Sequence, residues 1–401
     1  MRVLHVCSGN LYGGVETALV TLARLRDLCP AMESEFALCF AGRLAEELRA
    51  HNAQVHSLGA VRVRYPWTVA AARTALRKLL REKKYDAVVC HSAWPQALFG
   101  PVVRRVKIPL VFYLHGAADN RHWVDRWAGR VIPGFVICNS RYTQSTLPKM
   151  YPGVKSGVVY FPVAVPQKFT GEDRLAARSE LQTPADSVVI IQVSRMEAWK
   201  GHMLHLEALA RLPQTLEWVA WIVGGAQRPT EAQYAARLKE KAHELGITDR
   251  LRFTGQRNDI PRLLAAADIF CQPNLGPEPF GIGFVEALYA GLPVITTAMG
   301  GALEIVDDSC GMLLSPTDFL SKALSPNALS SDALSPNVPA ALASVLQQLL
   351  VDPQMRQKLA GSAPLRARQL CDPKKQMMAL ENLLSFAVGQ ESEACCARHH
   401  A

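Results

Sequence analysis

Two glutamates stand in one strip of the chain whose residue types suit a hydroxylated ligand. Glu278 and Glu286 are separated by seven residues in EPFGIGFVEALYAGLPVI. Gly281 and Gly283 let the backbone approach a ligand, and the apolar run 284–292 is typical of a helix whose N-terminal amides favour phosphate or sugar oxygens. Both carboxylates can accept hydrogen bonds from hydroxyl groups. The plainer interpretation is one glutamate favoured by the helix dipole and one solvated glutamate. Because other motifs accompany the strip, we favour a binding site for a nucleotide sugar.

Two cations follow an apolar, strand-like run in the second half of the chain. Arg195 and Lys200 lie just beyond residues 188–193 and before Gly201. Such a pair can hold a diphosphate, and the departure of a nucleoside diphosphate from a sugar requires that its charge be neutralised. Surface cations without a function are common, but the position after a strand and before a glycine favours the functional interpretation.

A histidine occupies a similar place in the first half. His115 follows the apolar run 110–114 and precedes Gly116, so we expect an imidazole at the carboxyl end of a strand. It could donate a hydrogen bond to a substrate. A lone histidine is more often a structural hydrogen-bonding residue, and only the position favours a functional role.

A glycine pair, Gly13 and Gly14, opens the segment after the first strand-like run. This arrangement permits close backbone approach by a phosphate or a hydroxylated ligand. Its spacing is not the Gly-x-Gly-x-x-Gly pattern of dinucleotide binding, and it lacks the Lys-Ser/Thr of a P-loop. Nicotinamide and ATP-hydrolysing functions are therefore disfavoured.

Strand-like runs alternate with helical patterns along most of the chain, which predicts parallel sheets. The predicted fold class is α/β, with two facing doubly wound Rossmann-like domains and a cleft between them. In such folds ligands bind at the carboxyl ends of the strands. We expect helices at 15–28 and beyond Trp94, and strands at 3–7, 87–90, 110–114, 135–139, 188–193, 218–223, 251–254, 269–272 and 293–296.

The composition is that of an ordinary globular protein with room for two cores. The 401 residues are 49% hydrophobic and 20% charged, and no apolar run reaches the roughly 18 residues that cross a bilayer. The ten cysteines are scattered without zinc or disulfide spacing. We expect a cytoplasmic protein without a signal peptide.

Positive charge is concentrated in the N-terminal part, where residues 1–180 hold 25 Lys and Arg against 13 Asp and Glu. Much of the excess lies between Arg62 and Lys84, in a segment with an apolar stripe and a basic face. An amphipathic helix packed on a sheet explains the pattern, and contact with the inner face of an anionic membrane or with an acidic acceptor is the alternative. Nucleic acid is disfavoured, since no binding module accompanies the charge. The stripe comprises Val69, Ala72, Leu76, Leu79 and Leu80, and the basic face Arg73, Arg77, Lys78, Arg81, Lys83 and Lys84.

We predict an N-terminal acceptor-binding domain over 1–165 and a donor-binding domain over 166–370. Ala-Leu-Ser-Pro-Asn occurs twice within 323–337, which indicates a surface-loop insertion over 321–337. A closing helix is expected over 371–389, with Met377, Leu380, Leu384 and Val388 on one face. We predict a disordered tail over 390–401, in preference to a metal site at its Cys and His residues.

These motifs, taken together, resemble retaining glycosyltransferases of family 4, which have the two-domain GT-B fold. The resemblance spans most of residues 1–370 and is strongest in the C-terminal half. Its motifs occur in the family's order: Gly13-Gly14, His115, Arg195 with Lys200-Gly201, Gly224-Gly225, Phe253-Thr254-Gly255, Ala267-Asp268, Glu278 with Glu286, and Gly300-Gly301.

The resemblance implies a role for each of these residues. Arg195 and Lys200 would hold the donor diphosphate, and Glu278 the transferred sugar. Donor binding would further involve Gly224, Phe280, Gly281, Ile282 and Gly283, with Glu286 on the ribose hydroxyls. His115 would act near the reacting carbon, so that the catalytic set is His115, Glu278, Arg195 and Lys200, and Gly13 and Gly14 would line the acceptor side.

The implied activity is transfer of a hexose from a UDP- or GDP-sugar to a glycan or lipid-linked acceptor in polysaccharide or glycolipid synthesis. No metal or other cofactor is implied, because the cations can stabilise the leaving group and the departing phosphate can take the acceptor's proton. Gly116 stands where many relatives have Asp, and Ser194 where Gly is common. A sugar-nucleotide 2-epimerase and a non-catalytic glycan-binding or assembly subunit remain the alternatives.

Overall fold

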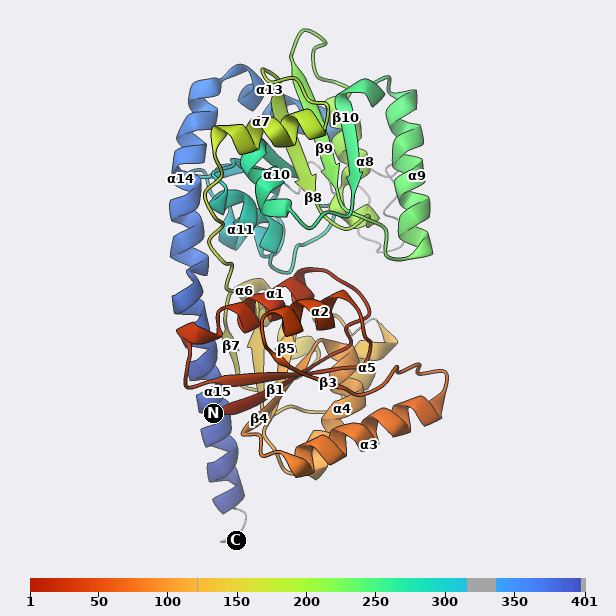
Figure 1. The fold of residues 1–401 in the computed structure, drawn as a ribbon, viewed down its shortest axis with the longest axis vertical. Coiled ribbons are helices and arrows are strands. Elements are labelled where there is room, and N and C mark those ends of the chain that lie inside the picture. The colour runs from red at the N-terminus through yellow and green to blue at the C-terminus, as the bar shows by residue number, and fades with distance from the viewer. Residues whose placement is uncertain (121, 316–336, 398–401) are drawn as a thin grey trace. The chain divides into compact units, whose positions relative to one another are not determined.

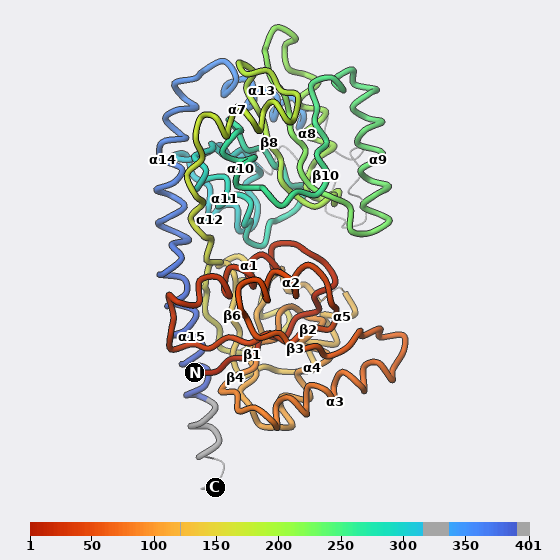
Figure 2. Tube along the Cα trace, viewed as in Figure 1, coloured from red at the N-terminus to blue at the C-terminus, as the bar shows by residue number. Residues whose placement is uncertain are grey.

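The computed structural model describes the backbone of residues 1–120, 122–315 and 337–397, with side chains up to residue 390. The chain divides into two compact units (Figures 1 and 2). The first unit comprises Met1–Ala164 and the chain from Cys371 onward, and the second comprises Val165–Leu370.

The first unit is built on a seven-stranded sheet of order β3-β2-β1-β4-β5-β6-β7. Every neighbouring pair of these strands is parallel. The strands are β1 (Arg2–Cys7), β2 (Glu33–Leu38), β3 (Gln54–Ser57), β4 (Ala87–His91), β5 (Leu110–Leu114), β6 (Phe135–Cys138) and β7 (Ser156–Val158). The helices are α1 (Gly14–Arg24), α2 (Arg43–Ala50), α3 (Pro66–Glu82), α4 (Ala93–Arg105), α5 (Trp123–Ala128), α6 (Arg141–Thr146) and α15 (Pro373–Ala397).

The second unit is built on a six-stranded sheet of order β10-β9-β8-β11-β12-β13, again parallel throughout. Its strands are β8 (Val188–Val193), β9 (Trp218–Val223), β10 (Leu251–Gly255), β11 (Ile269–Gln272), β12 (Val294–Thr297) and β13 (Gly311–Leu314). Its helices are α7 (Gly171–Glu180), α8 (His202–Leu209), α9 (Pro229–Glu244), α10 (Ile260–Ala266), α11 (Ile282–Tyr289), α12 (Ala302–Ile305), α13 (Asn337–Val351) and α14 (Pro353–Cys371).

Both sheets place the first strand of the unit in the middle and reverse their order beside it. The reversal lies between β1 and β4 in the first unit and between β8 and β11 in the second. In doubly wound folds, ligands bind outside the carboxyl ends of the strands at such a reversal. The predicted pair of doubly wound sheets is confirmed.

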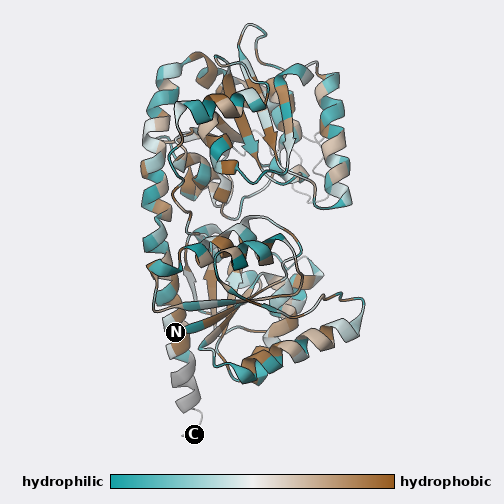
Figure 3. Cartoon of the chain, viewed as in Figure 1, coloured by the Kyte–Doolittle hydropathy of each residue, from teal (hydrophilic) through white to brown (hydrophobic). Residues whose placement is uncertain are grey.

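Each sheet is the centre of its unit's hydrophobic core. Val88, Val89 and Cys90 of β4 are completely buried, as are Ala220, Trp221 and Val223 of β9. Strands buried on both faces read as continuous apolar runs, which is why these were predictable. The strands are accordingly brown in much of Figure 3.

The basic segment of the first unit forms α3, which packs on that unit's own core through Ala72, Leu76 and Leu80. Teal and brown alternate along this helix in Figure 3. The structure corrects the expected basic face, because two of its members point to protein partners. Arg73 donates from Nε to the carbonyl of Leu98 at 2.7 Å, and Lys83 Nζ lies 3.0 Å from Glu35 Oε2.

The last helix belongs to the first unit. Met377, Leu380 and Leu384 of α15 are buried, and the rings of Phe386 and Phe135 meet edge to face at 5.7 Å. The helix continues to Ala397, beyond the predicted end at 389. Residues 398–401, with His399 and His400, and all of the repeat region but Asn337 lie outside the described residues.

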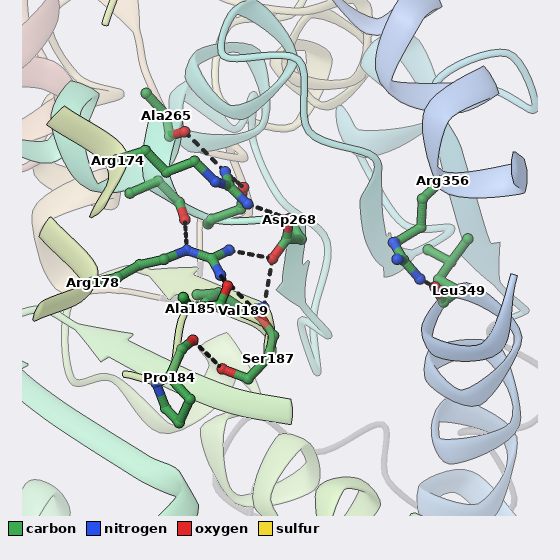
Figure 4. Close-up of polar contacts among 12 residues, drawn as sticks. Arg174, Arg178, Pro184, Ala185, Ser187, Val189, Ala265, Asp268, Leu349 and Arg356 are labelled. Atoms are coloured by element: carbon green, nitrogen blue, oxygen red, sulfur yellow. Dashed lines mark hydrogen bonds and ion pairs between the residues drawn. The ribbon is translucent and has the colours of Figure 1, made fainter. Parts of the chain in front are cut away.

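Asp268 ties together the amino-terminal edge of the second unit's sheet (Figure 4). Its carboxylate accepts from Arg174 at 2.6 Å, from Arg178 at 2.7 Å and from the backbone amide of Val189 at 2.7 Å. Arg178 is 4% exposed and also donates to the carbonyls of Ala185 and Ser187. Three elements, α7, β8 and the start of β11, are therefore held by one carboxylate.

Candidate functional site

Lys200 and Glu278 meet at the strand-order reversal of the second unit. Lys200 ends a short 3-10 turn after β8, and Glu278 lies in the loop after β11. Lys200 Nζ is 2.7 Å from Glu278 Oε2 and lies 3.8 Å from the centroid of the Trp199 ring. The same carboxylate oxygen accepts from Asn274 Nδ2 at 2.9 Å. The structure thus brings two predicted site residues from different loops into one hydrogen-bonded group.

The two loops that carry this pair are packed backbone against backbone. Gly201 has a φ of +74°, and a Cβ atom there would lie 1.8 Å from the carbonyl oxygen of Pro273. The amide of Leu275 donates to the carbonyl of Trp199 at 2.8 Å. Gln192 donates from Nε2 to the Lys200 carbonyl at 2.9 Å. Only glycine fits at residue 201, so the position of Lys200 is fixed by its backbone.

Arg195 is held by a separate acidic pair. Its Nη2 contacts Glu231 Oε1, and it lies 3.1 Å from Glu197 Oε1. Burial alone would raise the pKa of Glu231, but the amide of Gln227 and the Arg195 guanidinium outweigh it and lower that pKa. Arg195 Nε is buried without a hydrogen-bond partner among the described residues. The two predicted cations therefore follow the same strand but contact different carboxylates.

Gly224 follows β9 and supports the start of the Arg195 loop. Its φ is +152°, and a Cβ atom there would lie 1.9 Å from the carbonyl oxygen of Ser194. The Ser194 hydroxyl in turn lies 3.0 Å from Nε2 of His202, which is buried in α8. The position of Gly224 indicates close packing of backbone behind the cations.

The predicted helix after the glutamate strip is α11, which begins at Ile282, two residues before the expected start. Gly281 is its N-cap with a φ of +98°, and Phe280 before it is buried. The amides of Ile282 and Gly283 belong to the first turn, where no carbonyl of the helix precedes them. Glu286 lies one turn further along and is half-buried.

In the first unit the glycine pair opens α1 as predicted. Gly13 is the N-cap and Gly14 the first helical residue. The Gly13 amide donates to Glu16 Oε2 at 2.9 Å, so the helix's own acidic side chain satisfies it. Both glycines lie at the carboxyl end of β1, beside that unit's strand-order reversal.

His115 follows β5 and is not a lone histidine. Its Nε2 lies 2.9 Å from Nδ1 of His91, and its ring stacks on those of Tyr113 and Phe161. His91 Nε2 is in turn 2.9 Å from Nδ1 of His5. Burial lowers the pKa of His115 to about 3, so its ring is neutral at neutral pH.

Sequence reasoning missed the polar partners of the predicted residues. His91 and Gln272 each end a buried strand, and a polar residue that closes an apolar run at the binding edge is a usable signal. Asn274 stands four residues before Glu278, just ahead of the strip. Glu231 gave no such signal, because it lies at the start of α9, far along the chain from Arg195.

Across the described ranges, no helix is both long and apolar enough to cross a membrane. In the same part of the chain, no group of three or more His, Cys, Asp or Glu side chains is placed to hold a metal ion.

Family models match both units. The model described as Glycosyltransferase Family 4 matches residues 12–165, and the one described as Glycosyl transferases group 1 matches residues 173–328. The chain is 34% identical over 141 residues to the lipopolysaccharide core biosynthesis glycosyltransferase LpsE of Rhizobium meliloti, a match covering 35% of this chain and 38% of LpsE. The chain thus spans little more than a third of the length of that relative.

A second relative is the GDP-mannose-dependent alpha-(1-6)-phosphatidylinositol monomannoside mannosyltransferase of Mycolicibacterium smegmatis, 28% identical over 64% of this chain and 71% of that protein. Among solved structures, HepE of Anabaena in complex with UDP and glucose has a TM-score of 0.81 at 25% identity, covering 96% of this chain and 100% of HepE. This likeness confirms the GT-B fold class expected from the sequence.

Proposed function

Because the chain belongs to glycosyltransferase family 4, we propose that it is a retaining enzyme that moves a hexose from a UDP- or GDP-sugar to a hydroxyl of a glycan or lipid-linked acceptor. The observation that carries the proposal is the Lys200–Glu278 pair at the reversal between β8 and β11. A cation and a carboxylate there supply the two kinds of contact that a nucleotide sugar needs, to phosphate and to hydroxyl groups.

The donor would be held by groups of the second unit. Lys200 would exchange its contact with Glu278 for a diphosphate oxygen, leaving the carboxylate to accept from a sugar hydroxyl. The unpartnered Nε of Arg195 would donate to the same diphosphate. The amides of Ile282 and Gly283 would add donors near the phosphates, with Glu286 on the ribose.

In the proposed reaction, the bond between the sugar's anomeric carbon and the phosphate oxygen breaks, and its electron pair leaves with the nucleoside diphosphate. The acceptor oxygen forms the new bond on the same face, and its proton passes to the departing phosphate. Arg195 and Lys200 would stabilise the charge that develops there, so the proposal requires no metal ion. His115 would position the transferred sugar.

The first unit would bind the acceptor, with Gly13 and Gly14 at the edge of that site. Membrane contact is proposed for the exposed part of α3, where Lys78 and Arg81 face away from the core. Vesicles with anionic lipid should retain the protein at low salt and release it as salt rises. Equal retention by neutral vesicles would contradict this contact.

Thermal denaturation with UDP, GDP, ADP and their sugar conjugates tests the donor assignment, because a ligand that binds only the folded state raises its Tm. The related structure binds UDP and the related mannosyltransferase depends on GDP-mannose, so both bases belong in the panel. A shift with one base and its sugars identifies the donor, and Lys200→Ala should abolish it.

Product analysis then separates the remaining alternatives. A transferase incubated with donor alone leaves the sugar's configuration at C2 unchanged, whereas a 2-epimerase inverts it. Absence of any nucleotide-dependent shift in a folded sample would contradict the donor site and favour a non-catalytic glycan-binding subunit.

A further inference from the structure

A line of hydrogen-bonded side chains crosses the first unit's sheet and ends at His115. Ser34 of β2 lies 3.3 Å from Nε2 of His5 in β1, and His5 Nδ1 lies 2.9 Å from His91 Nε2 in β4. His91 Nδ1 lies 2.9 Å from Nε2 of His115, which follows β5. These four residues come from four neighbouring strands or their ends, in the order β2-β1-β4-β5.

The strand register explains why these side chains meet. Val3 is paired with Ser34, Val6 with Cys90, and Tyr113 with His91. Each step to the next strand therefore also moves two residues toward the carboxyl ends. Side chains alternate between faces along a strand, so a shift of two keeps every member on one face. The line runs diagonally across that face to the proposed binding edge.

The three rings are neutral. Burial lowers the pKa of His5 and of His115 to about 3, and it lowers the pKa of His91 well below its usual range, with the neighbouring rings adding to the effect. A neutral imidazole has one N–H and one bare nitrogen. Each contact between two rings requires one N–H donor and one bare acceptor. The nitrogen that carries the proton in one ring therefore determines which nitrogen carries the proton in each of the other two rings.

The last atom of the line has no partner. His115 Nδ1 is buried and makes no hydrogen bond to any described residue. A buried ring nitrogen without a partner is unfavourable, whether it is a donor or an acceptor. A substrate hydroxyl can satisfy it in either state, since a hydroxyl both donates and accepts.

We propose that His91 and His5 are positioning residues that couple the tautomer of His115 to their own, so that the line as a whole determines whether its Nδ1 donates to or accepts from a sugar hydroxyl. The reference to a sugar rests on the proposed function, whereas the coupling of the three tautomers rests on the ring geometry alone. All three rings must then carry their proton on the same nitrogen, either Nδ1 throughout or Nε2 throughout.

Nitrogen-15 NMR of histidine-labelled full-length protein tests the coupling, because protonated and bare ring nitrogens differ widely in chemical shift. The same tautomer in His5, His91 and His115 supports the proposal, and a different tautomer in any one of them overturns it. In His91→Phe, which keeps an aromatic ring in the stack, the His115 signals should move toward a mixture of both tautomers. Unchanged His115 signals in this variant would also overturn the proposal.

Activity gives the second readout. Transfer should fall about tenfold in kcat in His91→Phe and less in His5→Phe, although both residues are buried. His91→Gln, which keeps a donor and an acceptor, should recover part of the loss. Tyr113→Phe is the matched control, because its ring also contacts those of His91 and His115, whereas its hydroxyl donates to the carbonyl of Val159 and not to the histidine line.

The two readouts separate two kinds of failure. If the three histidines share one tautomer but the protein has no transferase activity, the proposed function is contradicted and the coupling of the tautomers is still supported. Losses of activity that are equal in His5→Phe and His91→Phe, and that follow a loss of thermal stability, would show that the histidines serve the fold alone and would overturn the positioning role.

Discussion

Both sheets reverse their strand order beside the first strand of the unit. At that reversal, however, the two units carry different kinds of side chains. Beside the reversal of the second unit stand charged groups, with Lys200 against Glu278 and Arg195 against Glu231. The edge of the first unit carries neutral imidazoles that end at His115. Charges suit a diphosphate, and a neutral hydrogen-bonding line suits a hydroxyl. Similar strand orders thus carry different side chains at their reversals.

Removing the charge from the second unit should have the largest effect on activity. In Lys200→Ala we expect transfer to fall by about two to three orders of magnitude, because the developing charge on the departing diphosphate loses a stabilising cation. Steady-state kinetics measures the loss. Lys241→Ala is the matched control, since Lys241 of α9 also pairs with a glutamate of this unit, Glu244, but both side chains are more exposed than those of Lys200 and Glu278. Equal turnover in the two variants would contradict the proposed role of Lys200 in transfer.

Adding a side-chain atom at the close backbone contact next to Lys200 should have the largest effect on stability. Gly201→Ala places a Cβ against the carbonyl of Pro273, and we expect unfolding free energy to fall by about 3 kcal/mol or more. Gly246→Ala shares the left-handed backbone, with a φ of +67°, but has nothing within 4 Å of the new atom. It should cost only about 1 kcal/mol. Urea unfolding compares the pair, and equal losses would mean that close packing at residue 201 has no importance.

The first unit also contains a charge cluster, but it lies toward the amino-terminal end of β1 and should serve stability alone. Burial by itself would raise the pKa of Glu35, but hydrogen bonds from Tyr85, His56, Lys83 and Arg2 outweigh it and lower that pKa to about 2. The unfolded chain therefore binds a proton more readily. The cluster contributes about 3 kcal/mol above pH 4.5, and this is lost as pH falls to about 2.

Glu35→Gln should remove that pH dependence and leave the kinetics of transfer at neutral pH unchanged at temperatures where the variant is folded. Unfolding free energies measured from pH 5 to pH 2 provide the comparison with the unaltered protein. A slope that persists in the variant would assign the acid sensitivity to other carboxylates.

The smallest effects should come from the basic residues of α3. Arg73→Ala removes a donor from the Leu98 carbonyl, and we expect a loss of about 1 to 2 kcal/mol. Lys78→Ala removes only an exposed pair with Glu82 and should change stability by less than about 0.5 kcal/mol. Thermal denaturation of both variants distinguishes the inward member of the basic helix from the outward one. Similar Tm values would contradict the inward role of Arg73.

Strand prediction succeeded where a strand is buried on both faces. The runs at β4, β5, β8 and β9 are apolar apart from His91 and Gln192, and their positions could be predicted from pattern alone. The unpredicted strands β2, β3, β7 and β13 are partly exposed or contain polar residues and glycine. Their pairing with neighbours, rather than local pattern, makes them strands.

The sequence by itself determined the two doubly wound units and the loops in which the candidate residues lie, because apolar periodicity, glycines and charges after strands are local signals. Only the tertiary structure decided the partners. His5 and His91 are 86 positions apart in the sequence, and Lys200 and Glu278 are 78 positions apart. Such pairs depend on strand order and register, which are determined by packing across the whole sheet. Neither residue by itself therefore indicates its partner in the sequence.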